Sequence, residues 1–536
     1  MESLADDLTQ MRRTLLSPDH VAAIREIATI RDYVPGQYVL PAGEALDRFV
    51  YVLEGEVEAV DPYTERRLMK GTIGPTQFVG DITFLSGARV TLPMRAVKAT
   101  QTLEVRRTEM LQLMSRIPEM SDIIISVMAA RRRMQLEVHA SSLKIIGADR
   151  DPSLQKIVAF ADRNKIPYIT EEIGDETTAD LGPAVGGHGS APAVIFGKDR
   201  VVEDPTPRKI ADLLGLDQGV TSGAAFDLLI VGGGPAGVAA GVYAGAEGLS
   251  ALVVDDIAIG GQAGTSSRIE NYMGFPTGIS GSDLAWRGYI QALKFGTQFA
   301  VPRRVSGIEA IEGGFDVRLD CDSKVRARAV LVATGVQYRR LPLNRLEDFE
   351  GAGVYYAATD MEARFCSGNE AAIIGGGNSA GQAAMFLRRH ASHVHLLVRG
   401  PSLAASMSDY LRSRLEADPN ITIHFETRVT QLNGHGSLET ITVDQSGKSQ
   451  TIDAPNLFVM VGAAPNTDWL SDLAELDNRG FVLSGETVGA TSSYATTHPG
   501  LFAVGDVRAR SVKRVASAVG EGSVVISDIW NFLNSD

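Results

Sequence analysis

The sequence contains little cysteine: Cys321 and Cys366 are the only two among its 536 residues. Two cysteines at this separation cannot build a disulfide scaffold, a four-cysteine zinc site or a Cys-x-x-Cys redox pair. The chain therefore has no vicinal dithiol of its own, and no metal site is predicted. Its composition, 44% hydrophobic and 22% charged, is that of an ordinary globular protein, and its length predicts about three to four domains.

Basic charge and long hydrophobic runs are also scarce. The chain has 51 Lys and Arg against 65 Asp and Glu, and a net charge of −14 argues against nucleic-acid binding. We expect the one compact basic run, Arg131–Arg133, to be a solvated helix face. The most apolar long stretch, around 226–254, is interrupted by glycines and Glu247, so no membrane helix is predicted. The start of the chain is acidic and lacks the apolar core of a signal peptide, which predicts a cytoplasmic protein.

The N-terminal half predicts two small units. Residues 1–143 show a helix, several short glycine-punctuated strands and then a helical pattern from about Glu109 to Leu143. Residues 144–217 alternate strand and helix, which indicates a compact α/β unit. The Gly-, Ser- and Thr-rich stretch 218–225 is typical of a linker.

A glycine-rich turn follows an apolar strand near residue 226. Gly232, Gly234 and Gly237 match G-x-G-x-x-G between a strand and an Ala-rich helix. The first glycine permits a tight turn, the second lets the backbone approach a pyrophosphate, and the third allows close helix packing. The helix start offers unpaired N–H groups to phosphate, and Asp255 stands where a carboxylate would bind a ribose hydroxyl. The alternative is a purely structural turn.

A second turn has the same strand–turn–helix–strand setting. Gly375, Gly377 and Ala380 form G-x-G-x-x-A, and the following strand ends in Arg399 rather than an acid. Arginine there accommodates a 2′-phosphate, which favours NADPH. Arg399 as a solvated surface residue is the alternative, and NADH then stays open. Two dinucleotide folds in one chain indicate a flavin that is reduced by a nicotinamide.

Residues 226–536 resemble the low-molecular-weight thioredoxin reductase family. The matching motifs are GGGPAG at 232–237, GGQ at 260–262, IENYMGFP at 269–276, VATG at 332–335, GGGNSA at 375–380, VGAAPNTDWL at 461–470 and FAVGDV at 502–507. The resemblance implies two Rossmann-like domains: an FAD-binding domain from 226–343 and 465–536, and an inserted NAD(P)H-binding domain at 344–464. A homodimer is also expected.

The resemblance assigns the binding residues by motif. It implies FAD contacts at Gly232, Gly234, Pro235, Ala236, Gly237, Asp255, Gly261, Gln262, Asn271, Thr334, Gly335, Gly505 and Asp506, with Lys513, Arg514 and Val515 along the isoalloxazine. It implies NAD(P)H contacts at Gly375, Gly377, Asn378, Ser379, Ala380 and Arg399.

The sequence departs from this family at its redox centre. Where the family carries Cys-Ala-Thr-Cys-Asp, this chain reads Ala357-Ala358-Thr359-Asp360-Met361. The candidate catalytic residues are Asp360, at the second cysteine's position, and Cys366, whose single thiol could form a mixed disulfide if exposed and acidic. A buried structural cysteine is the alternative for Cys366. Where the family carries four basic residues around the nicotinamide nucleotide, the chain has Val398, Arg399, Gly400 and Ala404.

Residues 30–105 resemble a cyclic nucleotide-binding β-roll, through FVYVLEGEV at 49–57 and GPTQFVGDITFLSG at 74–87. The resemblance implies a ribose contact at Gly80-Asp81, but Val90 stands where the phosphate-binding arginine belongs, with Arg89 beside it. We therefore expect a fold that serves regulation or assembly, and nucleotide binding is the less favoured alternative.

Residues 144–217 resemble a thioredoxin- or glutaredoxin-like unit. Ser190-Ala191-Pro192 stands at its expected cis-proline position. The Cys-x-x-Cys of such units is missing, which favours a spacer or docking role.

Together these features predict a multidomain flavoprotein oxidoreductase. Hydride would pass from NAD(P)H to FAD and on to an unidentified acceptor without an internal redox disulfide. Oxygen, a quinone, a small disulfide and an electron-transfer protein stay open as acceptors, although an acidic enzyme is poorly matched to acidic ferredoxins. The alternative is a non-enzymatic cofactor- or nucleotide-sensing assembly whose domain rotation signals to a partner.

Overall fold

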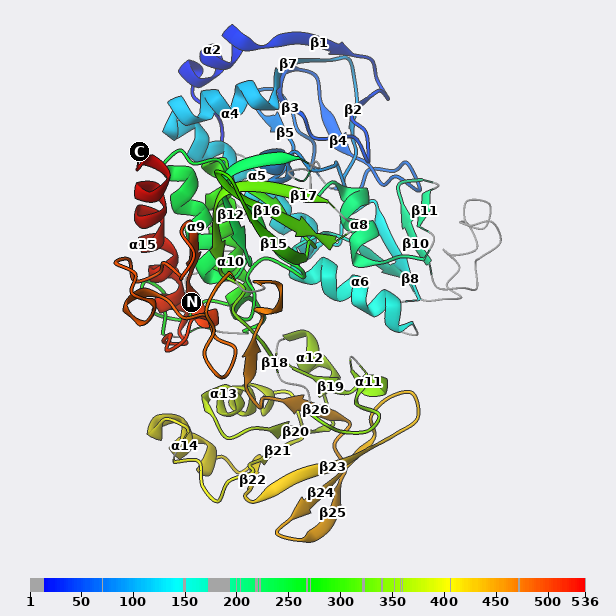
Figure 1. The fold of residues 1–536 in the computed structure, drawn as a ribbon. Coiled ribbons are helices and arrows are strands. Elements are labelled where there is room, and N and C mark those ends of the chain that lie inside the picture. The colour runs from blue at the N-terminus through cyan, green and yellow to red at the C-terminus, as the bar shows by residue number, and fades with distance from the viewer. Residues whose placement is uncertain are drawn as a thin grey trace. The chain divides into compact units, whose positions relative to one another are not determined.

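The computed structural model describes residues 14–535 except 70, 148–150, 172–192, 199, 203, 217–219, 221–222, 267–268, 270, 321–322, 339–340, 351, 357, 359, 405 and 471–472. The chain divides into two compact units, and Figure 1 labels its helices and strands. The first unit comprises the residues up to Val231 with Val238–Ile259 and Arg287–Val330, and the second comprises Gly232–Gly237, Gly260–Trp286 and Leu331–Asp536.

The first unit begins with a β-roll. Its elements are α2 (Pro18–Ile27), β1 (Thr29–Tyr33), β2 (Tyr38–Leu40), β3 (Arg48–Glu54), β4 (Val57–Ala59), β5 (Phe78–Val79), α3 (Thr83–Ser86), β6 (Met94–Ala96), β7 (Thr100–Arg106), α4 (Arg107–Arg116) and α5 (Pro118–Glu137). The strands form two sheets of order β1-β7-β3-β5 and β2-β6-β4. Every pairing in them is antiparallel. Phe49, Phe78 and Phe84 pack in the core, with ring centroids 5.3 and 5.9 Å apart.

The helix predicted over residues 109–143 is two helices and ends earlier. Pro118 opens α5, because proline has no N–H to continue α4 and its fixed φ suits a first helical position. Leu143 belongs instead to a strand, where it pairs with Phe196. Periodicity alone did not separate the buried strand from the helix before it.

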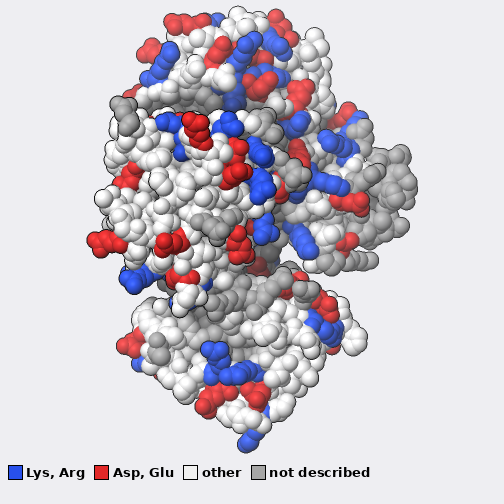
Figure 2. All heavy atoms as spheres, in the orientation of Figure 1, with Lys and Arg blue, Asp and Glu red and all other residues white. Residues whose placement is uncertain are grey.

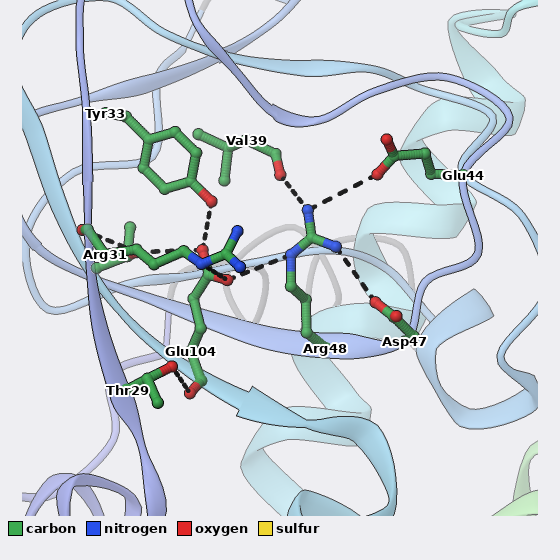
Figure 3. Close-up of polar contacts among 9 residues, drawn as sticks. Thr29, Arg31, Tyr33, Val39, Glu44, Asp47, Arg48 and Glu104 are labelled. Atoms are coloured by element: carbon green, nitrogen blue, oxygen red, sulfur yellow. Dashed lines mark hydrogen bonds and ion pairs between the residues drawn. The ribbon is translucent and has the colours of Figure 1, made fainter.

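A buried carboxylate ties three strands of the roll together (Figure 3). The Glu104 side chain on β7 is only 4% exposed and lies 3.3 Å from Arg48 of β3 and 3.6 Å from Arg31 of β1. The Tyr33 hydroxyl also donates to it. Because burial is costly for an unpaired charge, these partners are what make the position tolerable.

The predicted α/β unit follows. It consists of β8 (Leu143–Ile146), α6 (Pro152–Arg163), β9 (Ile169–Glu171), β10 (Ala193–Phe196), β11 (Arg200–Val202) and α8 (Pro207–Leu214). The sheet order is β11-β10-β8-β9. β8 and β9 run parallel and the other pairs antiparallel. The alternating strands and helices are confirmed, while the Ser190-Ala191-Pro192 position lies outside the described residues.

A seven-stranded sheet carries the first glycine turn. Its order is β14-β13-β12-β17-β16-β15, from β12 (Ala224–Val231), β13 (Ala251–Val254), β14 (Gln298–Ala300), β15 (Val305–Ile311), β16 (Gly314–Leu319) and β17 (Lys324–Val332). The last residues of β17 belong to the second unit, where β28 (Leu501–Ala503) pairs with this strand. β12, β13 and β14 are parallel, as expected for strands joined by the helix α9 (Pro235–Ala246) and by α10 (Gly281–Lys294).

The second unit carries a parallel sheet of order β19-β26-β20-β21-β22. Its strands and helices are β18 (Val336–Tyr338), α11 (Leu346–Phe349), β19 (Val354–Tyr355), α12 (Asp360–Phe365), β20 (Glu370–Ile374), α13 (Asn378–Leu387), β21 (His393–Leu397), α14 (Asp409–Glu416), β22 (Ile421–His424), β23 (Thr427–Asn433), β24 (Thr440–Gln445), β25 (Lys448–Ile452), β26 (Asn456–Val459), β27 (Ala463–Pro465) and α15 (Val515–Asn534). The short 3₁₀ helices are Ala263–Thr265, Asp468–Leu470, Gly485–Val488 and Gly505–Val507. Ile373 and Leu396 pack against α13 and α14, and Leu457 shares a second core with Ile441 of the β23-β24-β25 sheet.

Within the residues described, none of the helices combines the length and the apolar character that a bilayer crossing requires.

Candidate functional site

The first glycine turn lies between β12 and α9. Gly232 has φ +111°, and a Cβ there would lie 2.3 Å from the carbonyl oxygen of Ala333, so a side chain does not fit. Gly234 differs, because its Cβ would meet nothing nearer than the Cα of Gly261 at 4.0 Å. The first glycine thus serves backbone packing, while the second leaves open space where a pyrophosphate could approach the main chain.

Two segments from the end of the chain lie against the start of α9. A Cβ on Gly505 would be 3.1 Å from the Cβ of Ala236, and one on Gly522 would be 2.2 Å from the Ala236 carbonyl oxygen. Gly522 lies in α15, and Gly505 opens the 3₁₀ turn before it. The structure therefore brings the GGGPAG turn together with the FAVGDV motif, which are about 270 residues apart in the sequence, as the assignment of both to one cofactor requires.

The polar groups beside this turn have unfilled hydrogen-bonding capacity. Gln262 donates through Nε2 to the Val336 carbonyl at 3.4 Å, but its Oε1 is buried and has no partner among the described residues. Thr334 donates to the Asn466 carbonyl at 3.0 Å, and Gly335 has open space beside it. A buried amide oxygen without a partner is costly, so a ligand with a donor group fits this position. The residues present here can accommodate a flavin nucleotide.

Asp506 follows Gly505 in a 3₁₀ turn that the ion pair of Glu521 and Arg508, here called the Glu521–Arg508 clamp, holds in place. The sequence analysis did not predict this clamp. Burial raises the pKa of the Asp506 carboxyl, and Lys513 opposes the rise. Glu521 of α15 accepts a 2.6 Å bond from the Gly505 N–H, and Arg508 binds the same carboxylate at 2.8 and 3.2 Å. Glu521 and Arg508 therefore position the turn that presents Asp506. The available signal was an acid in the first half of a helix that is rich there in Gly, Ala and Val.

The other predicted FAD residues take simpler positions. In the first unit, Asp255 follows β13, and its Oδ1 accepts the N–H groups of Ile257 and Ala258 at 2.9 and 2.8 Å. In the second unit, Asn271, Lys513 and Arg514 are exposed, and Val515 opens α15. These assignments stay predictions.

The second glycine turn lies between β20 and α13. A Cβ on Gly375 would be 2.5 Å from the Met460 carbonyl oxygen, whereas one on Gly377 would meet nothing closer than 3.7 Å. Ser406 donates to the Gly376 carbonyl at 2.7 Å, and Asn378 accepts the Ser408 N–H at 2.8 Å. These two serines, which the sequence analysis missed, hold residues 406–408 against the turn.

The remaining nicotinamide-site candidates lie on or near α13. Ser379 is exposed near its start, Ala380 is buried, and Arg399 is exposed beyond β21. An exposed arginine at this point can reach a phosphate without a desolvation cost.

The altered redox centre precedes α12. Asp360 is the first residue of this helix, while Cys321, Ala357, Thr359 and the side chains of Asp360 and Met361 lie outside what the structure describes. Cys366 is fully buried in the core with Ala363 and Ile373, and its thiol donates to the Glu362 carbonyl at 3.6 Å. Burial, with a contribution from Glu362, raises the pKa of Cys366 to about 12. This environment is that of a structural cysteine, because a reactive thiol needs exposure and a lowered pKa.

The β-roll corrects one prediction about charge. Arg132 of the 131–133 run is not solvated: it is 7% exposed, as is Asp81, and its Nη2 lies 3.2 Å from the Asp81 carboxylate. It also donates to the Thr83 hydroxyl. Burial alone would raise the pKa of Asp81, but Arg132 and the hydrogen bonds from Thr83 outweigh it and lower the pKa. The helical periodicity did not show that this arginine faces an acid about 50 residues earlier.

The same carboxylate is the predicted ribose contact. Asp81 accepts the Thr83 N–H at 2.8 Å in addition to Arg132. Val90, at the position of the phosphate-binding arginine, is 5% exposed. The Asp81 carboxylate is therefore bound within the protein, and Val90 offers no charge to a phosphate.

Comparison with known proteins identifies two families along the chain. Residues 226–522 match the pyridine nucleotide-disulphide oxidoreductase family, and residues 30–117 match the cyclic nucleotide-binding domain. The chain is 33% identical over 319 residues to NADPH-dependent thioredoxin reductase 3 of Arabidopsis thaliana, a match covering 58% of this chain and 59% of that relative. It is 30% identical to the thioredoxin reductase of Mycoplasmopsis pulmonis, over 56% of this chain and 94% of the relative.

A solved structure gives the same result. The crystal structure of the T. acidophilum thioredoxin reductase matches with a TM-score of 0.53 and 28% identity, over 58% of this chain and 99% of that one. Family match, shared motifs and paired glycine turns agree, and the chain is a member of the pyridine nucleotide-disulphide oxidoreductase family that carries an N-terminal cyclic nucleotide-binding domain.

Proposed function

We propose that this protein is an FAD-dependent NAD(P)H oxidoreductase that delivers electrons to an external acceptor without an internal redox disulfide. One observation carries the proposal: both nucleotide turns are shaped to admit backbone contact with a ligand, while Ala357-Ala358-Thr359-Asp360 replaces the family's dithiol. The binding machinery is kept and the internal electron acceptor is missing.

The FAD-binding residues proposed are those of the first turn and its neighbours. The open space at Gly234 and the N–H groups at the start of α9 suit the pyrophosphate, and the unpartnered Oε1 of Gln262 suits a donor on the flavin. Asp506, held by the Glu521–Arg508 clamp, would accept a hydroxyl of the ribityl chain. Bound FAD would supply the two-electron acceptor for hydride from the nicotinamide.

The nicotinamide nucleotide would lie on the second turn. Gly377 leaves room for its pyrophosphate, and Ser406 and Ser408 keep residues 406–408 in place beside it. Arg399 is the one basic residue kept of the family's four, so it would supply the contact to a 2′-phosphate. We propose NADPH as the preferred donor, with NADH as a weaker one.

The N-terminal parts have a separate role in this proposal. The order β11-β10-β8-β9, with β8 and β9 parallel, is that of a thioredoxin-like unit, which supports this interpretation of residues 144–217. Lacking a Cys-x-x-Cys, the unit would serve as a spacer or docking element. We propose that residues 1–143 and 144–217 form the two N-terminal domains. Residues 226–343 with 465–536 would form the FAD-binding domain, and residues 344–464 the NAD(P)H-binding domain.

Anaerobic reductive titration tests the proposal. NADPH should bleach the flavin absorbance, and a full reduction should take about two electrons per flavin, because no disulfide is present to take a further pair. A Cys321→Ser/Cys366→Ser double variant should give the same end point. Absence of bleaching with NADPH and NADH would refute the enzyme, and an end point near four electrons would refute the missing disulfide.

Reoxidation of the reduced flavin identifies the electron acceptor. The reduced enzyme would be mixed with oxygen, a quinone, a small disulfide or thioredoxin, and the return of flavin absorbance followed. The relatives are named thioredoxin reductases. We nevertheless expect thioredoxin to reoxidise this enzyme no faster than a buffer control, because the chain lacks the dithiol that would pass electrons from the flavin to thioredoxin.

A further inference from the structure

The first unit contains a cavity of about 450 Å³ at the meeting point of the β-roll and the α/β unit. Three basic side chains line it: Arg89 from the β-roll, Arg200 from β11 and Lys209 from α8. Its apolar lining comes from Val201, Val202 and Leu213. A volume of this size lies within the range of small-molecule sites, and the mixture of cations with an apolar wall suits an amphiphilic anion.

Among the described lining residues, basic side chains outnumber acidic ones. Asp212 is the acid among them, and Arg208 pairs with its carboxylate at 3.1 Å. Figure 2 shows both basic and acidic side chains on the face where α8 and β11 lie. A concave surface lined by one sign of charge concentrates ligands of the opposite sign.

The cavity is part of a structured junction. The Arg89 N–H donates to the carbonyl of Leu214, at the last turn of α8, at 2.8 Å. The Arg89 guanidinium donates to the Gly43 carbonyl at 2.9 Å, and Ser142 donates its N–H to Thr91 at 2.7 Å. The bond to Leu214 joins the two folds beside the cavity, and the bond to Gly43 holds the Arg89 side chain at its wall.

Arg89 stands one residue before the position where a cyclic nucleotide-binding domain carries its phosphate-binding arginine. Inside the roll, Asp81 is bound by Arg132, and Val90 is buried. Arg89, next to Val90, instead lines the cavity beside the α/β unit.

We propose that this cavity binds a phosphate monoester of mononucleotide size. Arg89, Arg200 and Lys209 would hold the phosphate, and Val201, Val202 and Leu213 would contact the base. The ligand bridges the β-roll and the α/β unit, so its binding stabilises their junction. The proposal is independent of the electron acceptor and of the redox site.

Isothermal titration of the full-length holoenzyme with AMP, cyclic AMP and inorganic phosphate tests it. AMP should bind, inorganic phosphate should bind more weakly because it lacks the apolar part, and affinity should fall with added salt. Arg200→Ala and Lys209→Ala should each weaken AMP binding about tenfold, as expected for a lost charge-assisted bond. Lys98→Ala removes an equal charge from the β-roll surface and should change nothing.

Two outcomes would overturn the proposal. The first is no AMP binding at millimolar concentration. The second is unchanged affinity in Arg200→Ala and Lys209→Ala. Hydrogen exchange in the β-roll peptides, unchanged in these variants, controls for folding, and unchanged flavin bleaching by NADPH separates this test from that of the redox function.

Discussion

The buried pair of Asp81 and Arg132 allows a quantitative test of how the β-roll is held. Each residue is 7% exposed, and the carboxylate and guanidinium lie 3.2 Å apart. Replacing Arg132 with methionine keeps most of the side-chain volume but leaves the carboxylate buried without its counter-charge. Removing one partner of a buried pair costs about 3–5 kcal/mol.

The companion variants isolate the electrostatic part. Asp81→Asn removes the opposite charge but keeps an oxygen that can accept the Thr83 N–H. The double variant should cost less than the two single changes together, with a coupling energy of about 2 kcal/mol, because it leaves no buried charge. Arg133→Met is the matched control: its pair with Glu137 is exposed, so the cost should stay below about 0.5 kcal/mol.

The same pair predicts a pH dependence. The pKa of Asp81 is lowered in the folded protein, so its contribution to stability is fully present above the unfolded pKa of about 4. The contribution is lost as the pH falls from there through the folded value. Between pH 5 and 8 the local stability should therefore not depend on this group.

Hydrogen exchange followed by mass spectrometry measures these effects locally. Tryptophan fluorescence does not serve, because Trp286, Trp469 and Trp530 all lie outside the β-roll. The free energy of opening should fall in peptides that cover 78–90 and 118–137 in Arg132→Met. Unchanged exchange in that variant, or strictly additive losses in the double variant, would refute the reasoning.

Three further predictions concern the two nucleotide sites and Cys366. Arg399→Ala should raise the KM for NADPH about tenfold and leave that for NADH unchanged, because the 2′-phosphate is the difference; equal effects on both would remove Arg399 from this role. Glu521→Gln should increase FAD loss on dialysis, followed by flavin fluorescence, because the Gly505 turn loses a charged acceptor; full retention would show that the clamp is dispensable. Cys366 should resist thiol reagents at pH 8 in the native protein, since its pKa is about 12, and labelling before unfolding would contradict its burial.

The glycine turns were predictable because their signal is local. A tight turn between a strand and a helix demands glycine at fixed spacings, so the places of Gly232, Gly234 and Gly375 in their turns could be predicted from the sequence. The alternation of strands and helices in residues 144–217 was equally visible, because apolar runs and turn residues lie within a few positions of one another.

Long-range pairing was not predictable in the same way. In the sequence, Arg132 is one of three consecutive arginines. It is buried beside Asp81 because α5 packs against the β-roll. Glu521 likewise acquires its role from a turn 16 residues earlier. In both cases the partner comes from another element, so no spacing in the sequence records the contact.

The dithiol position and Val90, the two places where this chain departs from the families it resembles, have one property in common. The cofactor turns depend on backbone shape, and at Gly232 and Gly375 an added side chain would collide with a carbonyl oxygen at 2.3 and 2.5 Å, so their geometry is tied to the fold itself. The dithiol and the phosphate-binding arginine each depend on single side chains, and replacing these leaves the backbone intact. At Val90 an apolar residue also avoids a buried cation that would lack a partner when no phosphate is bound. The side chains at these two places can therefore change while the nucleotide turns keep their backbone shape.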